Sequence, residues 1–176
     1  MYKLINDSNK YDNYHYVDTI LFEKCELKDL DTDPKKYKLF SNDVFDYNID
    51  RNDVVIRHSN FRSNKYNAGI LYLNQTHGKY KNKLLYLCKP DDKRIPFFLI
   101  PYNQSYKFDK SIKQMYITFE FLHWEQKHPY GIITQNFGDI RSLNNFYEYI
   151  LYCKSLNVSI QQFTKQAKQK LSKQSN

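Results

Sequence analysis

Most of the chain's glycines and prolines lie in one stretch, and this clustering constrains the fold more than any other sequence feature. All four glycines and four of the five prolines fall between Ala68 and Gly138. Between them lie five short apolar runs, each bounded by turn-forming or basic residues: 69–73, 84–88, 95–100, 115–121 and 130–134. Short apolar runs at this spacing are typical of β-strands rather than helices.

Five strands within this stretch are too few for a β-sandwich, but they fit a small closed barrel of the oligonucleotide-binding (OB) type. Pairing around such a barrel removes most exposed strand edges. The sequence therefore predicts a mainly β protein with C-terminal helices. A five-stranded OB or cold-shock-type barrel is expected over residues 66–157, preceded by a smaller, acidic, β-rich segment over residues 1–60.

The N-terminal segment gives weaker signals. Residues 1–16 are polar without a period, and we expect a loosely ordered leader there. Short strands are predicted at 16–22, 39–45 and 53–56. Whether these strands form a partial second barrel stays open. Residues 57–65 are basic and polar, which favours a linker between the two halves.

The apolar spacing changes to a helical period after Gly138. The residues that share one predicted helix face are Leu143, Phe146, Tyr147, Ile150 and Leu151. With Ser142 as N-cap, they predict an amphipathic helix that rests this face on the barrel. A Ser-x-x-Gln capping box at Ser159 predicts a second, basic helix over residues 158–176. We expect it to be a basic arm or a docking element.

The net charge of +8 is distributed unevenly. Residues 1–56 hold 8 basic and 12 acidic side chains, residues 57–113 hold 12 and 3, and residues 114–176 hold 7 and 4. The basic excess coincides with the strand-rich centre, where it would attract a polyanion, so nucleic acid is the expected partner. No apolar run approaches the roughly 20 residues of a membrane-spanning helix, and no membrane partner is expected.

Three cysteines, Cys25, Cys88 and Cys153, lie far apart without a CxxC or His/Cys cluster. This pattern supports neither a disulfide framework nor a zinc site, and no cofactor is expected. Cys88 and Cys153 stand in apolar contexts and are expected to be buried thiols. The N-terminus lacks the apolar core of a secretion signal, so an intracellular location is expected.

A basic turn joins the first two strands of the predicted barrel. Cations alternate there with one aromatic ring, which suits a single strand whose base stacks on the ring. This loop borders the binding face of an OB barrel. The predicted nucleic-acid site comprises Lys79, Tyr80, Lys81 and Lys83, then Lys89, Lys93 and Arg94 from the neighbouring edge, and Lys127 and His128 as lesser candidates. The alternative is a solvated hairpin tip with Tyr80 packed on the barrel rim.

Two acidic or histidine-rich stretches invite a catalytic interpretation. Asp91 and Asp92 stand beside Lys89, Lys93 and Arg94, and neutralisation by these cations is favoured over a metal site. Residues 123–129 hold two histidines, but no recognisable motif ties a serine or cysteine nucleophile to them. No catalytic or metal-binding residue is therefore expected.

Several segments in order carry a family resemblance: 69–73, the turn at Gly78–Tyr80, 85–102, 127–133, 137–140 and 146–154. Together they resemble the second cold-shock domain of ribonuclease II/R-type 3′→5′ exoribonucleases, most closely the versions from large DNA viruses. The resemblance implies that the region guides single-stranded RNA towards a catalytic RNB domain, whose aspartates hold Mg²⁺. The chain ends about where that domain would begin, so Mg²⁺ is expected only there.

Three functions follow from these observations. The chain is an RNA-binding front part of, or accessory to, such an exoribonuclease; a stand-alone single-stranded nucleic-acid binder; or a protein-interaction module that regulates a nuclease through its acidic half. An independent enzyme is the least favoured alternative. The sequence leaves open whether the nucleic acid is RNA or DNA, which bases are preferred and what the oligomeric state is.

Overall fold

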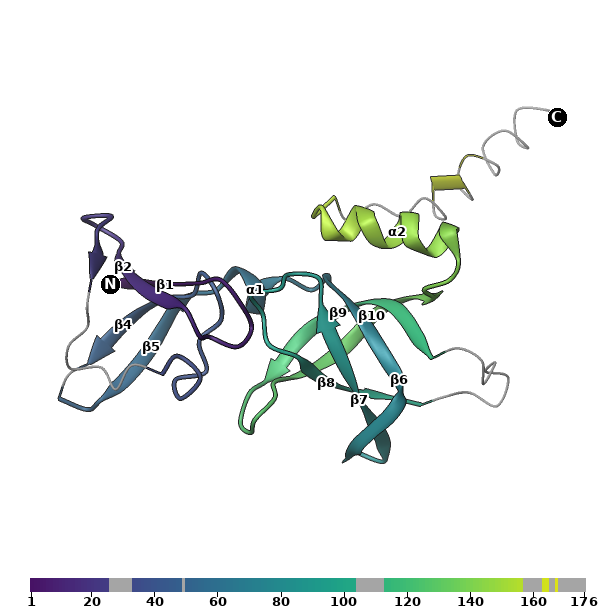
Figure 1. Ribbon diagram of the computed structural model, residues 1–176, viewed down its shortest axis with the longest axis horizontal. Helices are drawn as coiled ribbons and strands as arrows, with labels where there is room; N and C mark the ends of the chain where they lie inside the picture. Colours follow the sequence, from purple (N-terminus) through teal and green to yellow (C-terminus); the bar gives the residue numbers. More distant parts are fainter. Residues whose placement is uncertain (26–32, 49, 104–112, 157–162, 165–166, 168–176) are drawn as a thin grey trace.

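A computed structural model describes residues 1–25, 33–48, 50–103, 113–156, 163–164 and 167. These residues form ten strands and two helices. An N-terminal sheet and a β-barrel lie side by side, and helix α2 (Leu143–Cys153) covers one side of the barrel (Figure 1). The predicted fold class, mainly β with an OB-type barrel and a C-terminal helix, is confirmed.

The barrel is built from five strands: β6 (Asn67–Tyr80), β7 (Lys83–Pro90), β8 (Phe98–Tyr102), β9 (Gln114–His123) and β10 (Tyr130–Asp139). It is closed in the order β10-β8-β7-β6-β9. The pairings are antiparallel except between β10 and β8, where Tyr130 lies opposite Leu99 in parallel. All five predicted apolar runs fall within or overlap these strands.

Close backbone packing in the barrel explains two of the glycines. A Cβ atom at Gly69 would lie 2.8 Å from the Sγ of Cys88, and one at Gly131 would lie 2.9 Å from the carbonyl oxygen of Glu120. Only a residue without a side chain fits such a close approach. The expected burial of Cys88 is confirmed, whereas Cys153 is half-buried.

The N-terminal sheet contains β1 (Tyr2–Asn6), β2 (Tyr14–Asp18), β3 (Lys24–Cys25), β4 (Val44–Asn48) and β5 (Asp53–His58). Its order is β3-β2-β1-β4-β5, and every pairing is antiparallel. If the five strands of each region are numbered in chain order, strands that are neighbours in the sheet correspond to strands that are neighbours in the barrel. Within the described residues, no pairing joins β3 to β5, so the sheet lacks the contact that closes the barrel.

The predicted leader at residues 1–16 is wrong. Strand β1 lies at the centre of the sheet, with Leu4 fully buried and Tyr11 almost so. The Tyr11 hydroxyl donates a hydrogen bond to the carbonyl of Leu39 at 2.8 Å. Tyrosine rings supply the apolar area here, so a segment that looks polar by composition still builds a core.

The predicted strands at 16–22 and 39–45 are also misplaced. Strand β2 ends at Asp18, because its side-chain carboxylate accepts hydrogen bonds from the backbone N–H groups of Ile20 and Leu21 and so caps a turn. Residues 39–43 precede β4 and contain the buried Phe40. The predicted strand at 53–56 is confirmed as β5.

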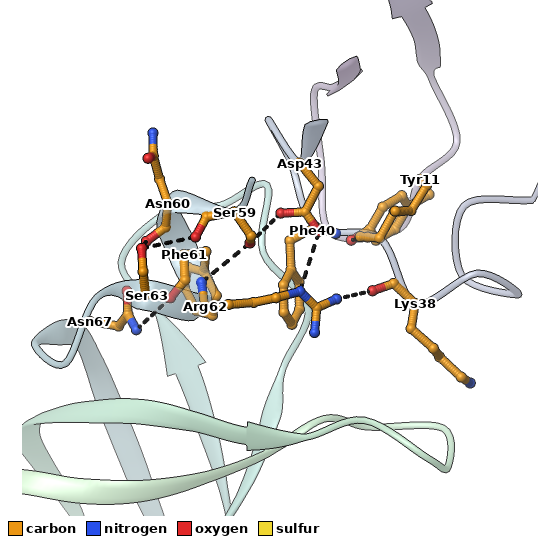
Figure 2. Close-up of polar contacts among 11 residues, drawn as sticks. Tyr11, Lys38, Phe40, Asp43, Ser59, Asn60, Phe61, Arg62, Ser63 and Asn67 are labelled. Atoms are coloured by element: carbon orange, nitrogen blue, oxygen red, sulfur yellow. Dashed lines mark hydrogen bonds and ion pairs between the residues drawn. The ribbon is translucent and has the colours of Figure 1, made fainter. Parts of the chain in front are cut away.

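The predicted linker at 57–65 contains helix α1 (Asn60–Ser63) and joins the sheet to the barrel (Figure 2). The Arg62 guanidinium lies 3.5 Å from the buried Asp43 carboxylate and donates a 2.5 Å hydrogen bond to the Lys38 carbonyl. Ser59, the N-cap of α1, donates a short hydrogen bond to Asp43. The segment is therefore a structured junction rather than a linker.

An aromatic ring from the N-terminal region completes the barrel core. Phe40 is fully buried, and its ring centroid lies 5.0 Å from Trp124 and 5.9 Å from Phe98, both barrel residues. The Arg62 guanidinium covers the same ring at 4.6 Å. The two regions therefore share one apolar core at their junction.

Helix α2 begins after Ser142 as predicted, but it packs through a different face. Its buried residues are Glu148, Tyr149 and Tyr152, and the Ser142 side chain makes no capping bond. Tyr149 stacks on Tyr116 of β9, with centroids 4.3 Å apart. The expected face is wrong for Leu143, Phe146 and Tyr147, which are exposed. Most of the predicted helix at 158–176, including Ser159, lies outside the described residues.

Candidate nucleic-acid interface

The predicted basic loop is largely strand. Strand β6 continues to Tyr80, which pairs with Lys83 of β7, so two residues, Lys81 and Asn82, form the turn. Both have positive φ angles, 45° and 65°, as a type I′ hairpin turn requires. Gly78 (φ 98°) lies in an irregular stretch of β6 just before the tip. The predicted basic turn is thus the tip of a twisted hairpin, and it carries Lys79, Lys81 and Lys83, all exposed.

Three aromatic rings meet beside this hairpin, and we call Tyr80, His123 and Tyr130 the ring cluster. His123 and Tyr130 stack with centroids 4.7 Å apart and planes 13° apart. The Tyr80 centroid lies 5.6 Å from that of Tyr130 and 6.0 Å from that of His123. All three side chains are partly exposed, and the Lys81 ammonium lies 5.3 Å from the Tyr80 centroid.

Sequence reasoning missed His123 and Tyr130 as members of this site. They come from the end of β9 and the start of β10 and lie opposite each other across that hairpin. The β6–β7 hairpin and the β9–β10 connection both project from the side of the barrel opposite α2 (Figure 1). A prediction of the β9–β10 hairpin register would have paired the two rings.

Of the lesser candidates, Lys127 is exposed and His128 is half-buried in the connection that leads into Tyr130. The Nδ1 atom of His128 lies 3.2 Å from the carbonyl oxygen of Phe97. Burial lowers the pKa of His128 despite this hydrogen bond, and the nearby Lys127 acts in the same direction. This histidine is thus favoured in its neutral form, and Lys127 supplies the positive charge here.

The remaining predicted residues lie away from the hairpin tip. Lys83 and Lys89 stand six positions apart on β7, which corresponds to about 20 Å of strand. The backbone carbonyls of Lys93 and Arg94 accept hydrogen bonds from Asn9 and Asn6 of the N-terminal region. Lys89, Lys93 and Arg94 therefore lie towards the junction with the N-terminal sheet rather than beside the ring cluster.

Arg94 is engaged by its neighbour. Its guanidinium forms two side-chain hydrogen bonds to Asp92, of 2.9 and 2.8 Å, which raise the pKa of Arg94. Burial opposes ionisation of Asp92, but the bonds from Arg94 prevail and lower its pKa. The expected neutralisation of the Asp91–Asp92 stretch by a neighbouring cation is confirmed for Asp92.

Among the described residues, no group of three or more His, Cys, Asp or Glu side chains is placed to hold a metal ion. No helix in the described ranges is long and apolar enough to cross a membrane.

Comparison with known proteins gives one family similarity. Residues 85–154, from β7 to the end of α2, match the family model of the Dis3-like cold-shock domain 2 (CSD2). The matched segment includes His123, Lys127, His128 and Tyr130, and it begins just after the β6–β7 hairpin tip. No curated protein matches the chain.

Proposed function

We propose that the protein binds single-stranded RNA on the ring cluster and the lysines of the β6–β7 hairpin. One observation carries the proposal: three partly exposed rings meet beside three exposed lysines, on an OB-type barrel similar to the Dis3-like cold-shock domain 2. Aromatic side chains stack unpaired bases whatever their identity, and basic groups alongside follow the phosphates.

The arrangement gives each part a separate task. An unpaired base stacks on the Tyr80 ring, which the positive-φ turn at Lys81 and Asn82 holds at a fixed position. Lys79, Lys81 and Lys83 contact phosphates on either side. Base stacking contributes about 1–3 kcal/mol per base, whereas the phosphate contacts add affinity that depends on salt.

We place this activity in the context that the resemblance implies. The chain acts inside the cell as an RNA-binding front part or accessory of an RNB-type exoribonuclease related to those of large DNA viruses, with a catalytic RNB domain or nuclease subunit as partner. It hydrolyses no RNA by itself, and its binding requires no divalent cation. Incubation of labelled RNA with Mg²⁺ or Mn²⁺ tests the first point, since shortening of the strand by pure protein contradicts it. Titration in EDTA tests the second.

Fluorescence anisotropy with a labelled single-stranded RNA tests the binding site. Tyr80→Ala should weaken binding by about 1–3 kcal/mol. The slope of log affinity against log salt concentration should stay unchanged, because a stacking contact releases no counterion. Tyr147→Ala is the matched control, since Tyr147 is 51% exposed on α2, across the barrel from the hairpin. Equal affinity of the Tyr80→Ala variant and the wild type would remove the ring from the site.

The lysines are tested by charge reversal. The triple change of Lys79, Lys81 and Lys83 to Glu should weaken binding and flatten the log–log salt slope by about 0.7 for each phosphate that the variant no longer neutralises. The control triple reverses Lys10, Lys24 and Lys154, which are exposed elsewhere. Unchanged affinity and slope in the hairpin triple would favour the protein-interaction function over RNA binding.

A further inference from the structure

A cavity of about 300 Å³ lies between the N-terminal region, α1, the barrel and α2, away from the ring cluster. Its walls come from four segments, represented by Ser41, Asn42, Phe61, Tyr66, Asp91 and Tyr152. The volume is at the small end of the range for ligand pockets. Because no single region supplies the walls, the cavity exists only when the N-terminal sheet is docked on the barrel.

One polar group beside the cavity lacks a partner. Ser41 is 7% exposed, and its buried Oγ makes no hydrogen bond to any of the described residues. Buried hydroxyls in folded proteins are nearly always paired, so the unpaired Oγ of Ser41, a residue that lines the cavity, is available to bind a ligand there.

The cavity also holds a carboxylate with spare acceptor capacity. Both carboxylate oxygens of Asp92 accept hydrogen bonds from Arg94. In Asp91, by contrast, Oδ1 lies 3.3 Å from the Tyr149 hydroxyl, and the side chain is exposed at the cavity wall. Asp92 and Arg94 neutralise each other, so Asp91 leaves the cavity negative. That charge disfavours phosphate and favours a neutral ligand that donates hydrogen bonds.

Aromatic side chains form part of the same wall. Phe61 packs into the shared core, and Tyr66 is 37% exposed, with its ring centroid 5.9 Å from that of Tyr152. Planar rings of this kind contact a flat heterocycle, while the carboxylate and hydroxyl contact its polar edge.

We propose that this cavity binds a guanine base. Guanine presents two adjacent donors, N1–H and the 2-amino group, which match the two oxygens of one carboxylate. Adenine and cytosine present one amino group on that edge, and uracil presents one N–H. Asp91 accepts the two donors, Ser41 supplies a further hydrogen bond, and Tyr66 contacts the base plane. The proposal goes beyond the RNA site at the ring cluster and does not depend on it.

Isothermal titration calorimetry of the full chain with free nucleosides tests this site. Guanosine should bind saturably, and inosine, which lacks the 2-amino group, should bind about tenfold more weakly. Adenosine should show no binding, and guanosine 5′-monophosphate should bind more weakly than guanosine because its phosphate is repelled by Asp91. Absence of saturable guanosine binding, or equal affinities for all four compounds, would overturn the proposal.

Three variants locate the ligand. Asp91→Asn should reduce guanosine affinity about tenfold, because its NH₂ group opposes a guanine donor. Asp12→Asn, an exposed change outside the cavity, should have no effect. Ser41→Ala should weaken guanosine binding without lowering the melting temperature, since it removes an unpaired hydroxyl. If Ser41 were purely structural, Ser41→Ala would lower the melting temperature and leave guanosine binding unchanged. RNA binding by the ring cluster should persist in all three variants, so the two proposals fail separately.

Discussion

The barrel and the N-terminal sheet place five strands in the same order, yet one is closed and the other is not. The first strand of each set differs most. Strand β6 has 14 residues and pairs with β9 over Asn67–Tyr72 and with β7 from Gly69 to Tyr80, while β1 has five residues. Irregular pairing between β6 and β7 bends the long strand around the barrel. A five-residue strand has no length left for such a bend.

The two regions also differ in glycine content and charge. All four glycines lie in the barrel region, where Gly69 and Gly131 permit close backbone contact. Residues 1–56 carry the acidic excess and residues 57–113 the basic excess. The comparison teaches that the same strand order serves two purposes: the closed, basic unit carries the ring cluster and the exposed lysines, and the acidic N-terminal region completes the barrel core with Phe40.

The largest expected effect comes from removing the ring that the regions share. Phe40→Ala should reduce the free energy of unfolding by about 3–5 kcal/mol, because it empties a fully buried site between Trp124 and Phe98. Urea unfolding measures the change. Phe22→Ala is the control, since Phe22 is 82% exposed, and it should stay within about 0.5 kcal/mol of the wild type. A small effect of Phe40→Ala would mean that the barrel is stable without the N-terminal region.

The second-largest effect on stability is expected from adding a methyl group inside the closed barrel. Gly69→Ala should cost about 1–3 kcal/mol, because its Cβ would lie 2.8 Å from the Sγ of Cys88 and 3.0 Å from the Lys89 carbonyl oxygen. The double variant with Cys88→Ala should recover part of this stability by relieving the sulfur contact. Additive costs of the two changes in urea unfolding would show that the contact is not the cause.

The helix on the barrel allows a matched pair of tyrosine changes. Tyr149→Ala should cost about 2 kcal/mol, because it removes a buried ring that stacks on Tyr116 in the packed face. Tyr147→Ala, on the exposed face, should change stability by less than about 0.5 kcal/mol. Thermal unfolding measures both, and the reverse ranking would support the face expected from apolar spacing.

The smallest effect is a pH dependence confined to the barrel. Burial lowers the pKa of His128 in the folded state, so folding resists its protonation. The stability that neutral His128 contributes is fully present above its pKa in the unfolded state. It is lost as the pH falls through the lower pKa of the folded state. Below pH about 6.5 the wild type should therefore lose stability relative to His128→Gln. Partial exposure keeps the effect small. Parallel curves for the two proteins from pH 7.5 to 5 would contradict this.

The barrel strands were predictable because turn residues separate their apolar runs. Strands β1 and β2 were harder to predict, because Lys3, Asn6 and His15 give them a polar composition. Alternation of Tyr14 and Tyr16 with the polar His15 was the available signal for β2. The junction contacts lie outside any local pattern, since Arg62 and Asp43 meet through the tertiary fold.

The candidate site was predicted in part for the same reason. A local run of cations identified the β6–β7 hairpin, whereas His123 and Tyr130 join Tyr80 from other strands. The face of α2 that packs on the barrel was mispredicted, because the spacing of hydrophobic residues favours the face with Leu143 over the face with Tyr149. The structure buries the tyrosine, whose ring stacks on Tyr116 while its hydroxyl reaches Asp91.

The shared core has a consequence for the order of events during synthesis. Lys38, beside Phe40, contacts the backbone of Gln126, and 88 positions separate these two residues. A ribosome that adds about 5–20 residues per second needs several seconds to cover that distance. Throughout this interval Phe40 of the nascent N-terminal region lacks its partners from the barrel, and it reaches its final packing only after Trp124 has emerged.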